Sequence, residues 1–459
     1  MLMRPRNRTN IRGIPRQFDV TGFLGSVFSL IAGLLVPFSV HLVGELHLAE
    51  IFLPLLLPFL MVMRGREMFK PTIRPILLLT GVWLLGQILT DIYRQTTMVN
   101  WLRGDSDIMF FGLELLALVA LLGKSDTRKA LFAAAYGTSQ LVYAKFHPDL
   151  RGRLSWKFGY APALVVLTLL VACYFYKRRN YAIAVLLILA FSAANVVENA
   201  RGMVLWMLIV IAVTMPIIPE RVGRLQLLPP QGTTARLLVI VALALSAGGV
   251  AFGVVEFATK IGMLGQFAQS KNEKQSQSVG GLLLGGRPEV LVCVRAILDS
   301  PILGHGSWPK EPRYSEMWQD IQAKYGMHVD LENDSEIAQG VIPTHSQILG
   351  AWVNAGVLGV FFWMYLFSPI VRALLRVAIL RPPLAPLYAY ILLHFFWDII
   401  FSPFAGDHRI FTAFYMVVMI DMLEARLPEP VAAYTARIGK FVRRPAVWRP
   451  SVHIDPNRL

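Results

Sequence analysis

Arg287 stands in a setting that suits an anion. It lies in the stretch Gly285-Gly286-Arg287-Pro288, before apolar residues whose spacing predicts a helix over 287–299. Glycines let a ligand approach the backbone, a helix start presents unpaired N–H groups, and a guanidinium forks onto a phosphate. The pattern favours a phosphate contact. A solvated loop arginine, or one paired with Glu289, is the alternative.

Arg201 is a second candidate for the same ligand. It follows Glu198, Asn199 and Ala200 and precedes Gly202, at the point where one apolar segment ends and the next begins. The start of the second helix adds the positive end of its dipole to the arginine charge. The alternatives are an arginine that extends to the membrane surface and an ion pair with Glu198.

His345 could serve as a base. It stands at the start of an apolar segment, after Pro343 and Thr344. A histidine near neutral pH can be uncharged and accept a proton from a hydroxyl group. Gly356 comes eleven residues later, about three helical turns, so we expect it on the same helix face, where a neighbouring helix could pack closely. An interfacial histidine beside a helix cap is the alternative for His345.

The composition shows what must position these residues. Of the 459 residues 55% are apolar and 16% are charged, against about 25% charged residues in ordinary soluble domains. Uninterrupted apolar runs such as 22–40 and 237–255 are too long for the strands or surface helices of a water-soluble fold. The proportions therefore exclude a soluble globular enzyme and indicate a protein that crosses a membrane many times.

A window of about 19 residues predicts about twelve membrane-spanning helices, which makes the fold all-α and polytopic. The segment near 130–146 is the weakest, because polar residues interrupt it. The predicted spans lie near 20–42, 48–63, 75–92, 107–123, 130–146, 158–176, 180–197, 202–218, 237–257, 344–368, 385–401 and 410–425.

The net charge of +15 supports this topology. Short cytoplasmic loops are enriched in Lys and Arg. With the N-terminus in the cytoplasm, every predicted loop on the cytoplasmic side is rich in these residues. Arginines between positions 4 and 16 precede a first span without a cleavage site, so we expect a retained anchor. Because the basic residues flank spans, we expect contacts with membrane lipid and no nucleic acid.

Four regions follow from this topology. We predict a bundle of nine spans over 1–257, a periplasmic loop with short helices over 258–343, three further spans over 344–425, and a basic cytoplasmic tail over 426–459. Both termini are then cytoplasmic. The candidate residues Arg201, Arg287 and His345 all fall on the periplasmic face.

Other residues are weaker candidates. Asp91 and Glu114 are acids within predicted spans and so are functional suspects, with capping or a buried pair as alternatives. For His305, between two glycines, a structural turn is expected. A set of alternating acids and one histidine resembles a cation loop but lacks its turn glycine, so we expect no metal. These residues are His328, Asp330, Glu332, Asp334 and Glu336.

In combination, four patterns resemble the O-antigen ligase and polysaccharide polymerase family, over about residues 195–365. Residues 287–291 fit its R-x3-L pattern, and His345 with Gly356 fits H-x10-G. Residues 301–306 (PILGHG) resemble its P-x-x-G-x-G turn, and Arg201-Gly202 resembles the start of one of its later helices. Residues 310–340 match no pattern of the family.

The resemblance implies an inverting glycosyl transfer that needs no metal or cofactor, on the periplasmic side of a bacterial inner membrane. The donor would be a glycan on undecaprenyl pyrophosphate and the acceptor a lipid-linked sugar such as lipid A core. His345 would act as general base on the acceptor hydroxyl, and Arg201 and Arg287 would hold the pyrophosphate.

Two alternatives remain open. One is an O-antigen or exopolysaccharide polymerase, which joins lipid-linked repeat units and differs only in its acceptor. The other, of a different class, is a flippase or transporter for lipid-linked glycans. Transporters are typically built from paired repeats with broken helices, and neither is visible in the sequence.

Overall fold

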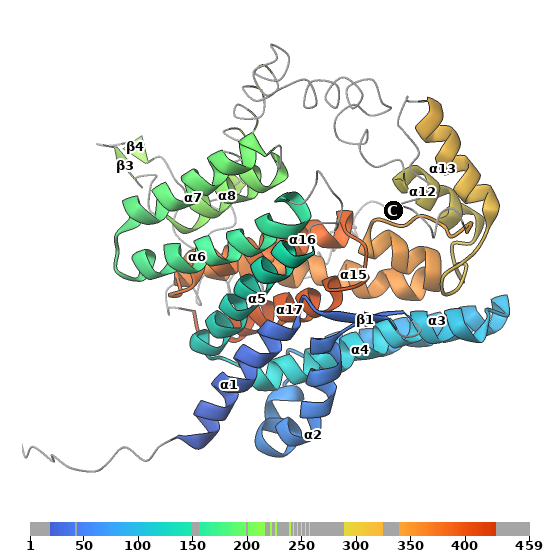
Figure 1. Cartoon of the computed structure of the whole chain (residues 1–459), viewed down its shortest axis with the longest axis horizontal. Helices are drawn as coiled ribbons and strands as arrows, with labels where there is room; N and C mark the ends of the chain where they lie inside the picture. The colour runs from blue at the N-terminus through green and yellow to red at the C-terminus, as the bar shows by residue number, and fades with distance from the viewer. Residues whose placement is uncertain are drawn as a thin grey trace, which may run out of the picture.

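The computed structural model describes residues 19–41, 44–147, 156–198, 201–215, 221–222, 225–226, 289–324 and 339–427, with isolated positions between 238 and 257. Over these residues the chain is all-α, with thirteen α-helices, one π-helical turn at Trp156–Tyr160 and two short hairpins (Figure 1). The hairpins pair β1 (Ser39–His41) with β2 (Glu45–His47) and β3 (Arg221–Val222) with β4 (Leu225–Gln226).

The helices follow the predicted apolar segments closely. They are α1 (Val20–Leu35), α2 (Leu48–Met68), α3 (Arg74–Arg94), α4 (Met98–Leu122), α5 (Asp126–Phe146), α6 (Ala161–Lys177), α7 (Tyr181–Val197), α8 (Arg201–Thr214), α12 (Glu289–Asp299), α13 (Pro312–Lys324), α15 (Gln347–Leu380), α16 (Ala385–Phe401) and α17 (His408–Glu424). The predicted segment near 237–257 lies almost wholly outside the described residues.

Three of the described helices, α2, α3 and α15, are long and apolar enough to cross a membrane. Their length and composition indicate membrane association. Several others are apolar but have at most 17 residues. The number of spans, twelve, therefore stays a prediction.

Three predicted boundaries differ from the structure by several residues. Helix α4, expected from about residue 107, already begins at Met98. The first span was expected over 20–42, but α1 ends at Leu35 and the chain forms the β1–β2 hairpin after Pro37, which has no N–H to continue a helix. The span expected over 344–368 is the first part of α15, which continues to Leu380 and ends at Arg381 in the left-handed conformation. The weakest predicted segment is confirmed as a helix, α5, which Ser125 caps.

Ion pairs join one set of helix ends. Glu424, the last residue of α17, lies 3.1 Å from Lys70 Nζ and 3.2 Å from Lys124 Nζ. Nearby, the Tyr388 hydroxyl at the start of α16 donates to Asp126 at the start of α5, at 2.6 Å. We call this the basic end of the helix bundle.

The opposite ends meet around Arg409, the second residue of α17. Its Nε lies 2.6 Å from Glu50 near the start of α2, and its Nη1 lies 2.5 Å from Asp107 in the first half of α4. Asn100 of α4 in turn donates to the carbonyl of Trp308, at 3.4 Å. We call this the turn end, because residues 300–311 lie on it. Helices α2, α4 and α17 thus run from the turn end to the basic end.

Buried aromatic rings hold α3, α4 and α15 together. Trp83 of α3 stacks on Phe362 of α15 with ring centroids 5.2 Å apart, and it contacts Phe404 at 5.1 Å. Phe111 of α4 meets the same two phenylalanines edge to face. Each such pair stabilises the fold by about 0.5–1.5 kcal/mol beyond the area that it buries. The three helices therefore form a rigid frame under the turn end.

Helices α12 and α13 pack on the first part of α15 through a second apolar cluster. Val292 and Ala296 of α12, Tyr314 and Trp318 of α13, and Val353 of α15 are all buried there. Figure 1 shows both short helices lying together over one end of α15. The segment expected to be a periplasmic loop with short helices thus includes at least two helices that are fixed to the bundle.

Candidate functional site

Helix α15 is interrupted at Gly356, and the turn at residues 301–306 fills the interruption. Gly356 has φ +62° and ψ −151°, a conformation that L-residues rarely adopt. The amide of Val357 donates to the carbonyl of Ile302, at 3.1 Å. The carbonyl of Val353 accepts from the amide of His305, at 2.7 Å. Groups that an unbroken helix would pair within itself are therefore paired with the turn.

The space at this junction excludes a side chain. A Cβ on Gly356 would overlap the carbonyl of Ile302, and a Cβ on Gly304 would overlap the backbone of residues 353–356. The expectation for Gly356 is therefore corrected: a turn packs there, where a neighbouring helix was expected. His345 and Gly356 also do not share one helix face, because α15 begins only at Gln347, after its cap Ser346.

His345 lies one residue before the helix cap. Ser346 caps α15 by accepting from the amide of Leu349, at 3.2 Å, and α15 begins at Gln347. The Ser346 hydroxyl also lies 3.3 Å from the carbonyl of Ile399 in α16. The side chain of His345 is exposed, and no residue that the structure describes forms a hydrogen bond with its imidazole. The alternative of a histidine beside a helix cap thus holds for its position.

Asp91 ties the turn to α3. Its carboxylate accepts from the amide of Ser307 at 2.7 Å and from the hydroxyl of Ser307 at 2.6 Å. Gln87, one helical turn earlier, donates to the Ser307 hydroxyl at 2.8 Å. Arg94, at the end of α3, donates to the carbonyl of Gly304 at 2.7 Å. Among the described residues Asp91 caps no helix; its carboxylate holds the turn.

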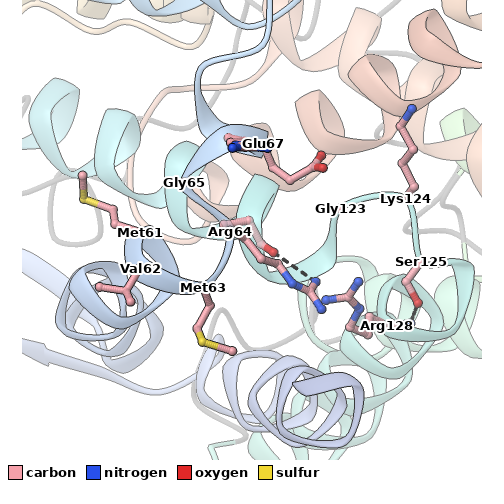
Figure 2. A pocket seen from close by; sticks show the side chains of 12 residues that line it. Met61, Val62, Met63, Arg64, Gly65, Glu67, Gly123, Lys124, Ser125 and Arg128 are labelled. Atoms are coloured by element: carbon pink, nitrogen blue, oxygen red, sulfur yellow. Dashed lines mark hydrogen bonds between the residues drawn. The ribbon is translucent and has the colours of Figure 1, made fainter. Parts of the chain in front are cut away.

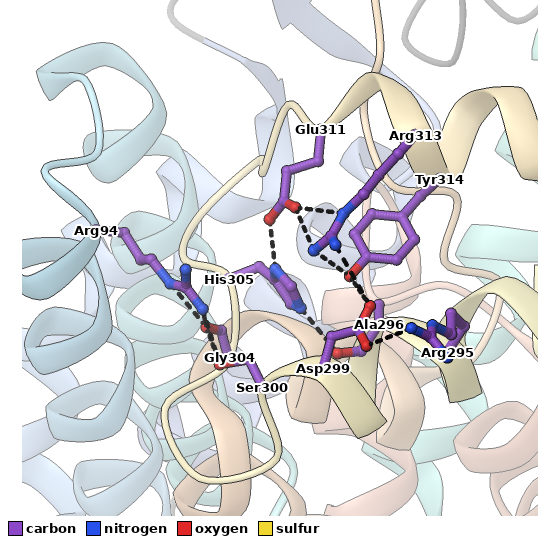
Figure 3. A network of polar contacts seen from close by, with 10 residues as sticks. All are labelled: Arg94, Arg295, Ala296, Asp299, Ser300, Gly304, His305, Glu311, Arg313 and Tyr314. Atoms are coloured by element: carbon purple, nitrogen blue, oxygen red, sulfur yellow. Dashed lines mark hydrogen bonds and ion pairs between the residues drawn. The ribbon is translucent and has the colours of Figure 1, made fainter.

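His305 has the structural role expected of it. The ring is buried; Nδ1 lies 2.5 Å from Glu311 and Nε2 lies 2.8 Å from the carbonyl of Ala296 in α12. Figure 3 shows the network of which it is part, between the end of α12 and the start of α13. At the other side of that network, the Tyr314 hydroxyl donates to Asp299 at 2.8 Å, and this bond lowers the pKa of the Asp299 carboxyl.

Helix α12 confirms the predicted helix over Glu289–Asp299. It is fixed next to the segment before His345, because the Cys293 thiol donates to the carbonyl of Pro343 at 3.3 Å. Burial raises the pKa of this thiol to about 12, so it is protonated at neutral pH. The helix therefore links the turn at one of its ends to the start of α15.

The structure describes less of the two predicted arginines than of His345. Arg201 is the first residue of α8, which packs on α16 through the rings of Trp206 and Trp397, with centroids 5.5 Å apart. Arg287 lies outside the described residues, two positions before α12 begins. The grouping of Arg201, Arg287 and His345 therefore stays a prediction.

One cluster near His345 was missed. The buried carboxylate of Asp398 in α16 lies 2.9 Å from His394 Nδ1 and 3.8 Å from His408 Nδ1, and it accepts from the Ser402 hydroxyl at 2.7 Å. Ile399, the residue after Asp398, is the one that pairs with Ser346. A histidine and an aspartate four residues apart in an apolar segment were the available signal. The pairing with His408 depends on the turn between α16 and α17.

A second missed feature is the cation at the centre of the turn end. Arg409 is 4% exposed and is enclosed by the carboxylates of Glu50 and Asp107. Glu114 lies deeper in the bundle and is fully buried; neither of its carboxyl oxygens has a hydrogen-bond partner among the described residues. A buried acid in this position is stable only when it is protonated or shares the charge of a neighbour. A functional role for Glu114 stays a prediction.

No group of three or more His, Cys, Asp or Glu side chains in the described ranges is arranged to hold a metal ion. The predicted cation-loop residues, between positions 328 and 336, lie outside those ranges. No protein-family model and no curated protein matches the chain.

Proposed function

We propose that the chain is a membrane glycosyltransferase of the O-antigen ligase type. It transfers a glycan from undecaprenyl pyrophosphate to a lipid-linked acceptor sugar such as lipid A core. The reaction takes place at the turn end of the bundle, which we assign to the periplasmic face of a bacterial inner membrane. Twelve spans with both termini in the cytoplasm complete the proposed topology.

The observation that supports this proposal most is the junction between two of the family-like patterns. The P-x-x-G-x-G stretch at residues 301–306 and the glycine of H-x10-G are far apart in sequence, yet they interlock through backbone hydrogen bonds at Gly356. A chance match of two short patterns would not require them to meet. The glycines stand where no other residue fits, which gives each pattern a physical reason.

The proposed chemistry needs one base and one anion site. The acceptor hydroxyl attacks C1 of the donor sugar from the face opposite the pyrophosphate, and His345 takes the hydroxyl proton. The bond between C1 and the phosphate oxygen breaks with its electron pair, so the pyrophosphate leaves with additional negative charge. Arg201 and Arg287 stabilise that charge. Inversion at C1 follows from attack on the opposite face.

The residues around His345 are held in place, as the proposed reaction requires. A general base must be positioned precisely to take the proton while the acceptor hydroxyl attacks. The cap at Ser346 is tied to α16, and the turn is tied to α3 by Asp91 and Arg94. Pyrophosphate is already an activated leaving group, so positioning and charge stabilisation supply most of the catalysis. The hydrogen bonds around Ser346 and the turn supply the positioning, and the exposed imidazole of His345 is the group that they position.

The interruption in α15 bears on the transporter alternative, since a broken helix, which was not visible in the sequence, is one of its marks. In transporters the freed backbone groups of a broken helix bind the substrate or an ion. Here the freed groups around Gly356 are already paired with residues 302–306. The interruption therefore favours a structural junction over a transport site.

The experiment that tests the function offers one donor and two acceptors to the purified protein in proteoliposomes. The donor is a glycan on undecaprenyl pyrophosphate, and the acceptors are lipid A core and a second lipid-linked repeat unit. Transfer to lipid A core alone supports a ligase. Transfer to the repeat unit alone makes the protein a polymerase, and transfer to neither contradicts the proposal.

A further inference from the structure

A cavity of about 870 Å³ opens at the basic end, away from the proposed site. The end of α2, the end of α4 and the start of α5 surround it (Figure 2). Its lining residues are Met61, Val62, Met63, Arg64, Gly65, Arg66, Glu67, Ala120, Gly123, Lys124, Ser125 and Arg128. Four of them are cations and one is an acid, so the cavity carries an excess of positive charge.

The acid in the lining does not neutralise the arginines. Glu67 forms an ion pair with Lys70, and Lys124 pairs with Glu424 at 3.2 Å. Within the described ranges, no carboxylate lies within ion-pair distance of Arg64, Arg66 or Arg128. A guanidinium has five N–H donors, so most of the donors in this cavity are available to a ligand.

Hydrogen bonds to backbone carbonyls of α4 orient two of the arginines. Arg64 Nη1 lies 3.4 Å from the carbonyl of Ala120, and Arg128 Nη1 lies 2.5 Å from the carbonyl of Leu121. Figure 2 shows both guanidinium groups directed to the same part of the cavity. Each guanidinium uses one of its nitrogens on a carbonyl, and its remaining N–H groups can donate to an anion. Their shared direction therefore points to an anionic ligand.

One helix start at the cavity favours negative charge, while the ends of α2 and α4 place backbone carbonyls beside the arginines. Helix α2 is interrupted at Arg64, which has φ −145° and ψ 25° inside the helix. Helix α5 begins at Asp126, and Lys124 and Ser125 before it line the cavity. The positive end of the α5 dipole thus adds to the arginine charges. The Asp19 carboxylate interacts electrostatically with Arg64 but lies beyond ion-pair distance, and it accepts hydrogen bonds from Thr21 and Gly22.

The apolar part of the lining distinguishes a lipid from a soluble anion. Met61, Val62 and Met63 are 48%, 87% and 43% exposed. They stand on α2, a helix long and apolar enough to cross a membrane. Exposed apolar side chains beside arginines match a phosphate group with an acyl chain attached, and basic pockets between spans bind such head groups.

We propose that this cavity binds the phosphate of an anionic phospholipid. Arg64 and Arg128 contact the phosphate oxygens, Lys124 and Arg66 add charge, and the apolar side chains of residues 61–63 contact the acyl chains. The bound lipid joins α2, α4 and α5 at the basic end. This inference does not depend on the proposed glycosyl transfer, because the cavity and the turn end share no residue.

The test measures lipid retention by the purified full-length protein. The protein is reconstituted in phosphatidylcholine with phosphatidylglycerol, extracted in mild detergent, washed, and its bound phosphatidylglycerol is quantified. The R64Q/R128Q variant should retain at least about tenfold less phosphatidylglycerol than the parent, a loss of about 1.4 kcal/mol or more. Retention equal to that of the parent protein overturns the proposal.

A matched control removes the same charge at the same end of the bundle. Arg74 donates to the carbonyl of Phe69, and Arg178 lies over the ring of Tyr174, so neither lines the cavity. The R74Q/R178Q variant should retain phosphatidylglycerol as the parent does. Equal losses in both double variants would show that only net charge matters, which contradicts a specific site.

Two further arms distinguish the source of the phosphate and protect the test against misfolding. Inorganic phosphate, added during the wash, should not displace the lipid; displacement by phosphate alone would assign the cavity to a soluble anion. On the unmodified protein, a photoreactive phosphatidylglycerol should label residues 61–67 or 123–128. Label confined to other segments overturns the proposal even if R64Q/R128Q does not fold.

Discussion

The two ends of the helix bundle use charge in opposite ways. At the turn end, each central ion is surrounded by partners: Arg409 by Glu50 and Asp107, and Asp398 by two histidines. At the basic end, lysines are paired, but the arginines that line the cavity have no acid partner in the described part of the chain. At the turn end these charged side chains are paired with each other, and at the basic end the cavity arginines remain available to a ligand.

This difference indicates that the turn end is held rigid by its own ion pairs and that the basic end binds a ligand of opposite charge. A fully paired polar cluster fixes the helices that carry it and leaves few donors for a ligand. At the turn end the exposed imidazole of His345 stands on such a frame. At the basic end, Arg64 and Arg128 donate to backbone carbonyls, and an anion would add charge-assisted hydrogen bonds to their remaining N–H groups. We therefore expect chemistry at the first end and lipid binding at the second.

The largest effect is expected from His345→Ala, which removes the proposed base from the frame. A positioned general base contributes about 10²–10⁴-fold to a rate, so glycan transfer should fall by at least about 100-fold. His41→Ala is the matched control, because His41 is an exposed histidine of β1 and should transfer at the rate of the parent. A His345→Ala protein that transfers normally would leave the turn end without its base.

The next effect is expected from the proposed anion contacts. Arg201→Ala and Arg287→Ala should each raise the barrier by about 2.7–4 kcal/mol, by analogy with donors that stabilise a developing oxyanion. The Lys variants should keep part of the activity, because an ammonium retains the charge and loses the two-pronged geometry. The comparison uses initial rates of transfer. Full activity of both Ala variants would remove these arginines from the site.

A smaller effect is expected at the junction that supports His345. Gly356→Ala introduces a Cβ into the carbonyl of Ile302 at a positive φ, which costs about 1–3 kcal/mol in backbone strain before the clash is counted. The unfolding temperature in detergent should fall, and transfer should fall with it. Gly81→Ala in α3 is the control, since no atom lies within 4 Å of its Cβ and a helical Ala is favoured over Gly. Equal stability of the two variants would contradict the described junction.

The smallest effect is a pH dependence in the network of α12 and α13. The hydrogen bond from Tyr314 holds the pKa of Asp299 below its ordinary value of 3.8. A lowered pKa contributes stability that is present above the ordinary value and is lost as the pH falls through the lowered one. Amide exchange in α12 and α13 should therefore accelerate under acid, and Asp299→Asn should remove that acceleration. Unchanged acid sensitivity in the Asn variant would assign it to another group.

The helices could be predicted because their information is local. Apolar length and helical spacing indicated α5 and α12 within a few residues, and the polar interruptions of α5 did not prevent a helix. The predicted helix boundaries were wrong where a single residue determines the end of a helix. Pro37 follows the end of α1 within an apolar run, and Ser346 is a better cap than its neighbour, which moved the start of α15 past His345.

The junctions could not be predicted because they join distant residues. Gly356 stands in an apolar stretch that reads as continuous helix, and only the carbonyl of Ile302, more than fifty residues earlier, explains its conformation. The same holds for Asp91 and Ser307, and for Glu50 and Arg409. Sequence patterns named Gly356 and Asp91 as special, and they did not name Glu50 or Arg409. Tertiary contact determined what each of them does.

The most direct test of this division of roles is the location of the bound pyrophosphate. A photoreactive analogue of undecaprenyl pyrophosphate is crosslinked to the reconstituted protein, and the labelled peptides that excess natural donor protects are identified. We predict protected label at the turn end, around residues 199–203, 285–291 and 343–347. Protected label only at the basic end, around residues 61–67 and 123–128, would contradict the assignment of glycosyl transfer to the turn end.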